Sequence, residues 1–263
     1  MELSGKRVLI TGASRGIGAA LAQACADAGA KVALAARSGE AITALAERLG
    51  GQAYPIDLSD QSQVDGFIAR VEADGGPVDV LVNNAAVDTN QLIDEIDEAE
   101  IGRCISLNLI TPQRLVRQVL PGMLQRGAGH LVHVSSMASI VNVPGTSVYS
   151  STKAGLSHFS GGLRADLKGT PIGLTLVEPG PVDTEMWDHV NMGSAVAAAG
   201  RRFERLRQMP HSSPETLAAM VVKAVQSDRY HVRLPKRGLG LFVLEDLPRR
   251  ALAACLVGIN PRR

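Results

Sequence analysis

The sequence predicts an α/β fold of the Rossmann type, in which helices cover both faces of a doubly wound parallel sheet. Short apolar runs alternate along the chain with longer segments of helical periodicity, and a glycine-rich turn follows the first apolar run. Strands that alternate with helices imply parallel pairing through right-handed crossovers. We therefore expect a single three-layer α/β/α domain over residues 1–234, followed by a C-terminal extension over residues 235–263.

The first half of the chain predicts alternating strands and helices that lead up to the centre of the sheet. The expected strands lie at 7–11, 32–36, 52–56 and 78–82, and the expected helices at 17–28 and 41–49. Gly29 follows the first helix, where a helix C-terminal glycine belongs. Ser59 or Asp60 is expected to cap a further helix before the last of these strands.

The second half continues the alternation. A long helical region is expected at 98–125, in which Pro112 either bends the helix or lies in an adjusted turn. The later strands are predicted at 130–135, 172–177 and 230–234, and the later helices at 149–167 and 214–227. Ser213 is in position to cap the last helix. His130 and His133 alternate on one strand, which favours a structural role over metal binding.

Composition narrows the class of protein. The formal net charge of +1 gives no argument for a nucleic-acid partner. The cysteines, Cys25, Cys104 and Cys255, are far apart and lack metal-ligand spacing, so we expect free thiols, no metal site and a cytoplasmic location. The N-terminus lacks the apolar stretch of a signal peptide, and no apolar run approaches the roughly 20 residues of a membrane span.

A phosphate-binding turn is predicted between the first strand and the first helix. Gly12, Gly16 and Gly18 allow a tight turn and a close approach of the backbone to a pyrophosphate. The amides at the start of the helix point at that anion. Because glycines also make ordinary turns, it is the position between a strand and a helix that favours dinucleotide binding.

The end of the second strand indicates which dinucleotide is bound. An acidic residue there would hold the ribose 2′-hydroxyl of NAD, but the strand is followed by Arg37, and Glu40 comes only in the next helix. Arg15 in the glycine turn and Arg37 can together clamp a 2′-phosphate. The alternative is that both arginines are solvated surface charges. We therefore expect NADP(H) in preference to NAD(H).

A possible acid–base pair opens the helix predicted at 149–167. Tyr149 and Lys153 are four residues apart and therefore share one helix face. The ordinary pKa of tyrosine is about 10, and a neighbouring ammonium lowers it by favouring the phenolate. This spacing alone is common on helix surfaces, but Ser135 and Ser136 end the preceding strand at the sheet edge where such folds place ligands.

Taken together, these motifs resemble the short-chain dehydrogenase/reductase family. The shared elements are, in order, Thr11-Gly12-x-x-x-Gly16-x-Gly18, Asn83-Asn84-Ala85, Asn108, Ser136, Tyr149-x-x-x-Lys153 and Pro179-Gly180. The resemblance extends from about Lys6 to about Leu234. Ala86 stands where the family usually has glycine, and the usual glycine-rich ending after the last strand is missing.

The resemblance implies a catalytic set of Asn108, Ser136, Tyr149 and Lys153. Tyr149 would be the general acid in carbonyl reduction or the base in alcohol oxidation. Lys153 would lower the pKa of Tyr149 and hold the nicotinamide ribose hydroxyls. Ser136 would hydrogen-bond the substrate oxygen, with Ser135 as the alternative, and Asn108 would hold a water that links Lys153 to solvent.

The resemblance also implies the residues that hold the dinucleotide. Asp57 would meet the adenine amino group, Asn83 the adenosine side, and the 179–184 segment the nicotinamide carboxamide. Arg15 with Arg37 is similar to the pattern of the family's NADP-preferring members. The expected cofactor residues are Gly12, Ser14, Arg15, Gly16, Ile17, Gly18, Arg37, Asp57, Leu58, Asn83, Ala85, Tyr149, Lys153, Pro179, Gly180, Val182 and Thr184.

The substrate side and the tail are the last predictions. The family uses the region after the cofactor loop, here about 185–210, as a lid. The expected substrate residues are Ser136, Met137, Asn142, Val143, Met186 and Trp187, although packing within the lid is an equal alternative for several of them. The apolar and basic tail at 235–263 is expected to pack within the protein or its homodimer or homotetramer, with peripheral membrane contact as the alternative.

The sequence therefore predicts an NADP(H)-dependent enzyme that interconverts a ketone or aldehyde and an alcohol, on a lipid-, steroid- or xenobiotic-like substrate. Two alternatives stay open: a 3-oxoacyl reductase of fatty-acid or polyketide metabolism, and a catalytically silent, dinucleotide-sensing regulatory protein. The complete catalytic set argues against the silent protein. Substrate identity, reaction direction and the number of subunits stay open.

Overall fold

A computed structural model of the chain describes residues 1–141, 143–184, 197 and 211–234. Its centre is a seven-stranded sheet in the order β3-β2-β1-β4-β5-β6-β7, and every pairing is parallel. The strands are β1 (Arg7–Thr11), β2 (Lys31–Ala36), β3 (Gln52–Pro55), β4 (Val80–Asn83), β5 (Gly129–Val134), β6 (Ile172–Pro179) and β7 (His231–Leu234). The predicted doubly wound Rossmann-type sheet is confirmed.

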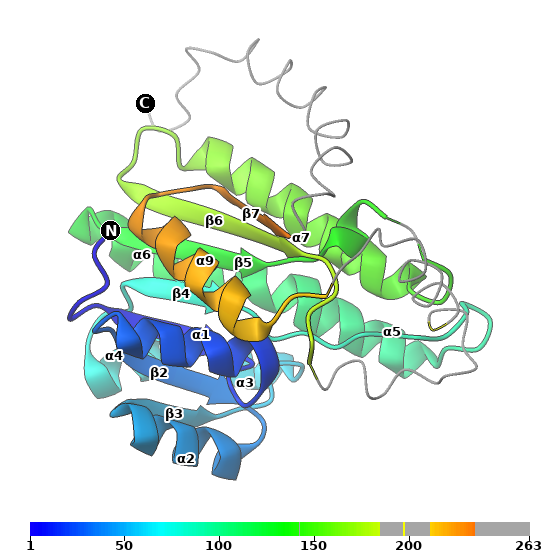
Figure 1. The fold of residues 1–263 in the computed structure, drawn as a ribbon, viewed down its shortest axis with the longest axis horizontal. Coiled ribbons are helices and arrows are strands. Elements are labelled where there is room, and N and C mark those ends of the chain that lie inside the picture. Colours follow the sequence, from blue (N-terminus) through cyan, green and yellow to red (C-terminus); the bar gives the residue numbers. More distant parts are fainter. Residues whose placement is uncertain (142, 185–196, 198–210, 235–263) are drawn as a thin grey trace.

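Two apolar cores, one on each face, hold helices against this sheet. Successive strand residues point to opposite faces, so Val8 and Ile10 enter one core and Leu9 enters the other. The helices on the first face are α1 (Gly16–Asp27), α2 (Gly39–Leu49) and α9 (Pro214–Gln226). Those on the second face are α4 (Phe67–Gly75), α6 (Thr111–Arg126) and α7 (Ser147–Asp166) (Figure 1).

The winding of the sheet reverses at β1. Ile10 pairs with Leu34 of β2 on one side and with Val82 of β4 on the other. The crossovers on the two sides of β1 run in opposite directions, which opens a crevice above the carboxyl ends of the strands. The ligand site is expected in this crevice.

The long helical region predicted at 98–125 is divided by a change of winding. It consists of α5 (Glu98–Ile105), a π-helical turn (Ser106–Ile110) and α6, and Pro112 lies in the first turn of α6. Proline is tolerated there because the first amides of a helix have no partner within it. The expected change of helical geometry therefore lies just before Pro112, in the π-helical turn that contains Asn108, and not at the proline itself.

Helix ends follow the predicted capping residues. The Asp60 side chain accepts a hydrogen bond from the Ser62 amide and so begins α3 (Gln61–Val64). Ser213 caps α9 through the Thr216 amide at 3.1 Å. Gly29 follows α1 with a φ of 81°, in the left-handed region that suits glycine.

The remaining predictions concern residues that the structure does not describe, the cysteines, membrane spans and metal sites. The predicted lid at 185–210, apart from Ala197, and the tail at 235–263 lie outside the described residues, as do Asn142, Met186, Trp187 and Cys255. Cys25 and Cys104 are buried free thiols. Among the described residues there is no helix suited to crossing a membrane. The same part of the chain contains no group of metal-ligating side chains.

Candidate active site

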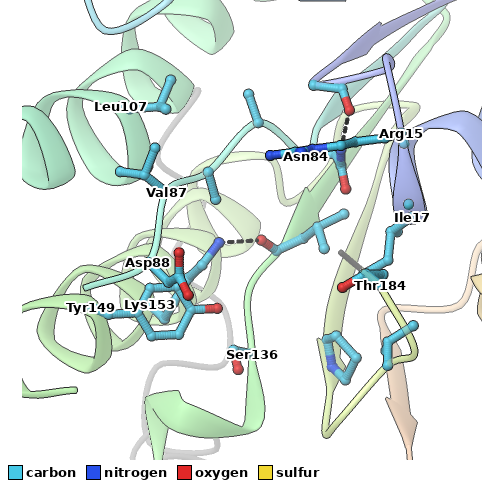
Figure 2. A pocket seen from close by; sticks show the side chains of 18 of the residues that line it. Arg15, Ile17, Asn84, Val87, Asp88, Leu107, Ser136, Tyr149, Lys153 and Thr184 are labelled. Carbon is cyan, nitrogen blue, oxygen red and sulfur yellow. Dashed lines mark hydrogen bonds between the residues drawn. The ribbon is translucent and has the colours of Figure 1, made fainter. Parts of the chain in front are cut away.

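A large pocket opens at the carboxyl edge of the sheet, in the crevice beside β1. Its volume is about 1120 Å³. Segments that follow six strands line it: Gly12 after β1, Arg37 after β2, Asp57 after β3, Asn84 after β4, Ser136 after β5 and Gly180 after β6. The predicted cofactor and catalytic segments therefore meet in one cavity (Figure 2).

The glycine turn leaves no room for side chains. A Cβ on Gly12 would lie 2.7 Å from the Ala85 Cα, and Gly12 has a φ of 65°. A Cβ on Gly18 would overlap the carbonyl oxygen of Gly12. The turn is therefore closed tightly against the segment after β4, and α1 starts at Gly16 with its amides facing the pocket.

Asn84 joins the ends of β1 and β4. Its side-chain amide donates to the carbonyl oxygens of Thr11 and Gly12, at 2.9 and 3.1 Å. In return, the Thr11 hydroxyl oxygen accepts from the backbone amides of Asn84 and Ala85, at 3.0 and 3.1 Å. These bonds fix the geometry of the glycine turn. The motif Asn83-Asn84-Ala85 predicts asparagines that stabilise a turn or meet the cofactor, and Asn84 has the first of these functions.

Asn83 is buried at the end of β4 and does not line the pocket. Its side-chain nitrogen and oxygen both lack a hydrogen-bond partner among the described residues. A buried amide without partners is costly. The support for a bound dinucleotide comes instead from the glycine turn, where the backbone faces the pocket and no space is left for a Cβ.

The pocket is positively charged at the end of β2. Arg15 and Arg37 are exposed and both line the pocket, and Arg103 of α5 contributes a third guanidinium. Asp57 accepts hydrogen bonds from the Ser59 amide at 2.9 Å and the Ser59 hydroxyl at 2.7 Å. Burial by itself raises the pKa of Asp57, but the Ser59 bonds and the charges of Arg37 and Arg103 bring that pKa below its ordinary value.

Tyr149 and Lys153 lie in the first turns of α7 at the other end of the pocket. The Lys153 side chain is buried, and its ammonium donates to the Val134 carbonyl oxygen at 3.0 Å. The same ammonium lies 5.6 Å from the centroid of the Tyr149 ring. Ser136 also lines this end, and its hydroxyl oxygen accepts from the Ala138 amide at 3.1 Å (Figure 2).

The prediction that Lys153 lowers the pKa of Tyr149 is wrong for this structure. Burial raises the pKa of Tyr149 to about 12, against an opposing effect of the Ser136 side chain, and the negative charge of Asp88 raises it further. Burial also lowers the pKa of Lys153 to about 8. The ammonium is directed to the Val134 carbonyl, so the cost of an enclosed phenolate exceeds its attraction.

Asn108 lies behind the pocket wall, in the π-helical turn. Its side-chain oxygen accepts from the Val87 amide at 2.9 Å, and its side-chain nitrogen donates to the Val87 carbonyl at 2.8 Å and to the Thr152 hydroxyl at 3.1 Å. The side chain therefore ties the segment after β4 to α7. Ser135 has a related position, since its hydroxyl donates to the Lys153 carbonyl at 2.9 Å.

Most of the predicted site residues meet at the pocket. Of the cofactor set, the residues that line it are Gly12, Ser14, Arg15, Gly16, Ile17, Gly18, Arg37, Asp57, Leu58, Ala85, Tyr149, Lys153, Pro179, Gly180, Val182 and Thr184. Of the substrate set, Ser136, Met137 and Val143 line it. Polar lining residues that sequence reasoning missed are Ser38, Asp88, Asn90, Arg103, Thr146 and His211. Asp88 and Asn90 could have been predicted as lining residues from their position just after β4, at the edge of the sheet where ligands bind.

Comparison with known proteins agrees with this geometry. The family model of the short chain dehydrogenases matches residues 6–222. The chain belongs to the short-chain dehydrogenase/reductase family. Members of this family are oxidoreductases that act on CH–OH groups, and the predicted family resemblance is confirmed.

Individual members of the short-chain dehydrogenase/reductase family are similar over most of the chain. The ketoacyl reductase HetN of Nostoc sp. is 36% identical over 230 residues, which cover 86% of this chain and 77% of the relative. A short-chain dehydrogenase from Sphingobium yanoikuyae, solved in complex with NADPH, is 26% identical with a TM-score of 0.80 and 98% coverage of both chains. A family member from Burkholderia phymatum in complex with NAD has a TM-score of 0.81 at 24% identity, with coverage of 95% and 96%.

Proposed function

We propose that this protein is an NADP(H)-dependent carbonyl reductase, which interconverts a ketone or aldehyde and the corresponding alcohol. The observation that carries the proposal is the arrangement of one continuous pocket, with Arg15 and Arg37 at one end and Ser136, Tyr149 and Lys153 at the other. A silent dinucleotide-binding protein would have no need of the second group of side chains.

The arginine end supports NADP(H). No carboxylate follows β2 at the position of Arg37, where an acid would favour the ribose 2′-hydroxyl of NAD. Arg15 and Arg37 offer forked donors to a 2′-phosphate. Asp57 follows β3 instead, where it is oriented by Ser59 and suits the adenine amino group.

The reacting end supports proton transfer to a carbonyl oxygen. When bound, the nicotinamide supplies a hydride to the carbonyl carbon. The Tyr149 phenol holds a proton across the neutral range, since its pKa is raised to about 12, and it donates this proton to the substrate oxygen. The Ser136 hydroxyl donates a hydrogen bond to the same oxygen, and the Lys153 ammonium holds the ribose hydroxyls. In this proposal the Asn108 side chain, which is fully hydrogen-bonded, positions α7.

The walls near Ser136 support an apolar carbonyl substrate. Met137 is buried, Val141 and Val143 are half-buried, and all three line the pocket. A 3-oxoacyl reductase is the second candidate, and the similarity to the Nostoc ketoacyl reductase favours it. Exposed Leu92, Ile93 and Ile110 support the proposed association of like subunits.

A substrate screen tests the enzyme proposal. Purified protein is expected to oxidise NADPH with members of a panel of aliphatic, aromatic and steroid ketones and a 3-oxoacyl thioester, as followed by NADPH absorbance. Tyr149→Phe should lower kcat by about a hundredfold or more, because the proton donor is lost. NADPH binding without turnover of any ketone, or unchanged activity of Tyr149→Phe, would contradict it. Calorimetric binding of NADPH to the variant controls for folding.

The cofactor proposal has its own test. Arg37→Asp should raise KM for NADPH by roughly tenfold or more and leave KM for NADH unchanged or lower, because the 2′-phosphate loses a forked donor and meets a negative charge. An equal loss with both dinucleotides would contradict NADP(H) preference. Arg70→Asp, which changes an exposed arginine on α4 outside the pocket, is the matched control.

A further inference from the structure

A carboxylate lies at the reacting end of the pocket. Asp88 is half-buried, follows β4 by a short segment and lines the same cavity as Ser136 and Tyr149. In Figure 2 the Asp88 side chain lies at the same end of the pocket as Tyr149. The negative charge of Asp88 raises the pKa of the Tyr149 phenol, as expected for two side chains in the same part of the pocket. A substrate carbonyl that reaches Tyr149 therefore also comes close to Asp88.

The contacts of Asp88 leave its charge uncompensated. The side-chain amide of Asn90 donates to Oδ2 of Asp88 at 2.8 Å and fixes the orientation of the carboxylate. Its other oxygen has no hydrogen-bond partner among the described residues. Within the same part of the chain, no lysine, arginine or histidine forms an ion pair with Asp88.

The nearest catalytic cation does not neutralise this carboxylate. The Lys153 ammonium donates to the Val134 carbonyl oxygen (Figure 2), and among the described residues it forms no ion pair with Asp88. Arg103, which also lines the pocket, acts on Asp57 at the other end. A half-buried carboxylate that has no ion-pair partner among the described residues is stabilised by an incoming cation and repels an anion.

We propose that Asp88 selects a carbonyl substrate that carries a cationic nitrogen close to the carbonyl group. This inference rests on the proposed reductase function and specifies its substrate class. The carbonyl oxygen lies at Tyr149 and Ser136, the nitrogen faces Asp88, and the remaining carbons contact the apolar wall at Met137 and Val143.

The same geometry couples substrate charge to the proton donor. Without a cation, the Asp88 carboxylate opposes the phenolate that forms at Tyr149 when the proton leaves. A substrate cation beside Asp88 compensates this charge and so favours proton transfer in the complex. A neutral ketone of the same shape lacks this effect, so the preference for the cation extends to kcat as well as to binding.

Two ketones of equal shape test the proposal. These are 1-(trimethylammonio)propan-2-one and its carbon isostere 4,4-dimethylpentan-2-one, which differ in charge but hardly in volume. Calorimetry on the full chain saturated with NADP⁺, where no reduction takes place, should show that the cation binds roughly tenfold tighter or more. With NADPH, the ratio of kcat/KM for the two ketones should favour the cation by at least as much.

Two variants decide whether Asp88 is responsible. Asp88→Asn keeps the side-chain shape and should reduce both ratios by roughly tenfold or more. Asp94→Asn removes an exposed carboxylate outside the pocket and should leave both ratios as in the natural sequence. Equal binding of the two ketones, no detectable binding of the cation, or an unchanged ratio in Asp88→Asn would overturn the inference. Failure of the reductase proposal can be told apart from failure of this inference, because the protein would then turn over no ketone of the panel.

Discussion

Burial changes the pKa of two basic side chains, Lys153 in the pocket and His133 on β5, because a charged group is costly to enclose. Lys153 has 3% of its surface exposed and His133 has none, and burial lowers the pKa of both. Each group therefore titrates at a different pH in the folded and the unfolded chain. Because such a difference is also a difference in folding free energy, both residues make the stability of the protein depend on pH.

Replacing Lys153 is expected to stabilise the fold while it destroys the site. The pKa of Lys153 is about 8 in the folded chain and ordinarily 10.5, so the folded state is penalised below pH 8 and the penalty disappears as the pH rises from about 8 to about 10.5. Lys153→Met should raise the free energy of unfolding at pH 7 by about 1–3 kcal/mol and abolish this rise. Urea denaturation across this pH range measures it, with the exposed Lys168→Met as control. A destabilised Lys153→Met protein would contradict the expectation.

His133 is expected to make the fold sensitive to acid. Ser160 donates to the Leu156 carbonyl and so accepts from Nδ1 of His133, which leaves Nε2 buried with no hydrogen-bond partner in the described part of the chain. The pKa of His133 is about 4, so the stability present above pH 6.5 is lost as the pH falls toward 4, by up to about 3 kcal/mol. His133→Phe should flatten this dependence in urea denaturation, whereas the exposed His158→Gln should not. His130, whose pKa is also about 4, accounts for the acid sensitivity that remains.

Among the secondary-structure elements, the contact region between β1, α1 and the segment after β4, here called the joint, sets the geometry of the glycine turn. The glycine turn is closed by backbone contacts, and Asn84 fixes the two strand ends with hydrogen bonds from its side chain. The start of α1 is therefore set by the position of the segment after β4. A methyl group added here is expected to displace the glycine turn that lines the pocket.

Gly18→Ala tests this joint. The added Cβ would overlap the Gly12 carbonyl and lie 2.7 Å from the Asn84 side-chain nitrogen, so the turn must open. We expect a loss of about 1–3 kcal/mol in the free energy of unfolding and weaker NADPH binding by calorimetry. Gly162→Ala on α7 has open space around its Cβ and should instead stabilise the protein by about 1 kcal/mol. Normal NADPH affinity in Gly18→Ala would contradict the role of the joint.

Across the whole molecule, the features that could be predicted from the sequence are those that depend on short sequence patterns, namely the strands and the cofactor residues. The alternation of apolar runs located the strands, and the family resemblance brought sixteen of the seventeen cofactor residues to the pocket, all except Asn83. The pKa values of the catalytic side chains could not be predicted, because the sequence does not show how deeply each side chain is buried. The spacing of Tyr149 and Lys153 indicates proximity but not the desolvation that raises one pKa and lowers the other. Asp88 was missed because only the pairing of β4 with β1 brings the segment after β4 to the pocket.

The reversal of the sheet at β1 also divides the gene into two parts that can be inherited separately. The groups for the adenosine end, including Arg15, Arg37 and Asp57, are encoded before β4 ends, and the reacting groups Ser136, Tyr149 and Lys153 are encoded after it. A recombination event between these stretches would exchange Arg15, Arg37 and Asp57 while it preserved Ser136, Tyr149 and Lys153. Asp88 is encoded just after β4, so the side chain proposed to select the substrate can be inherited with either part.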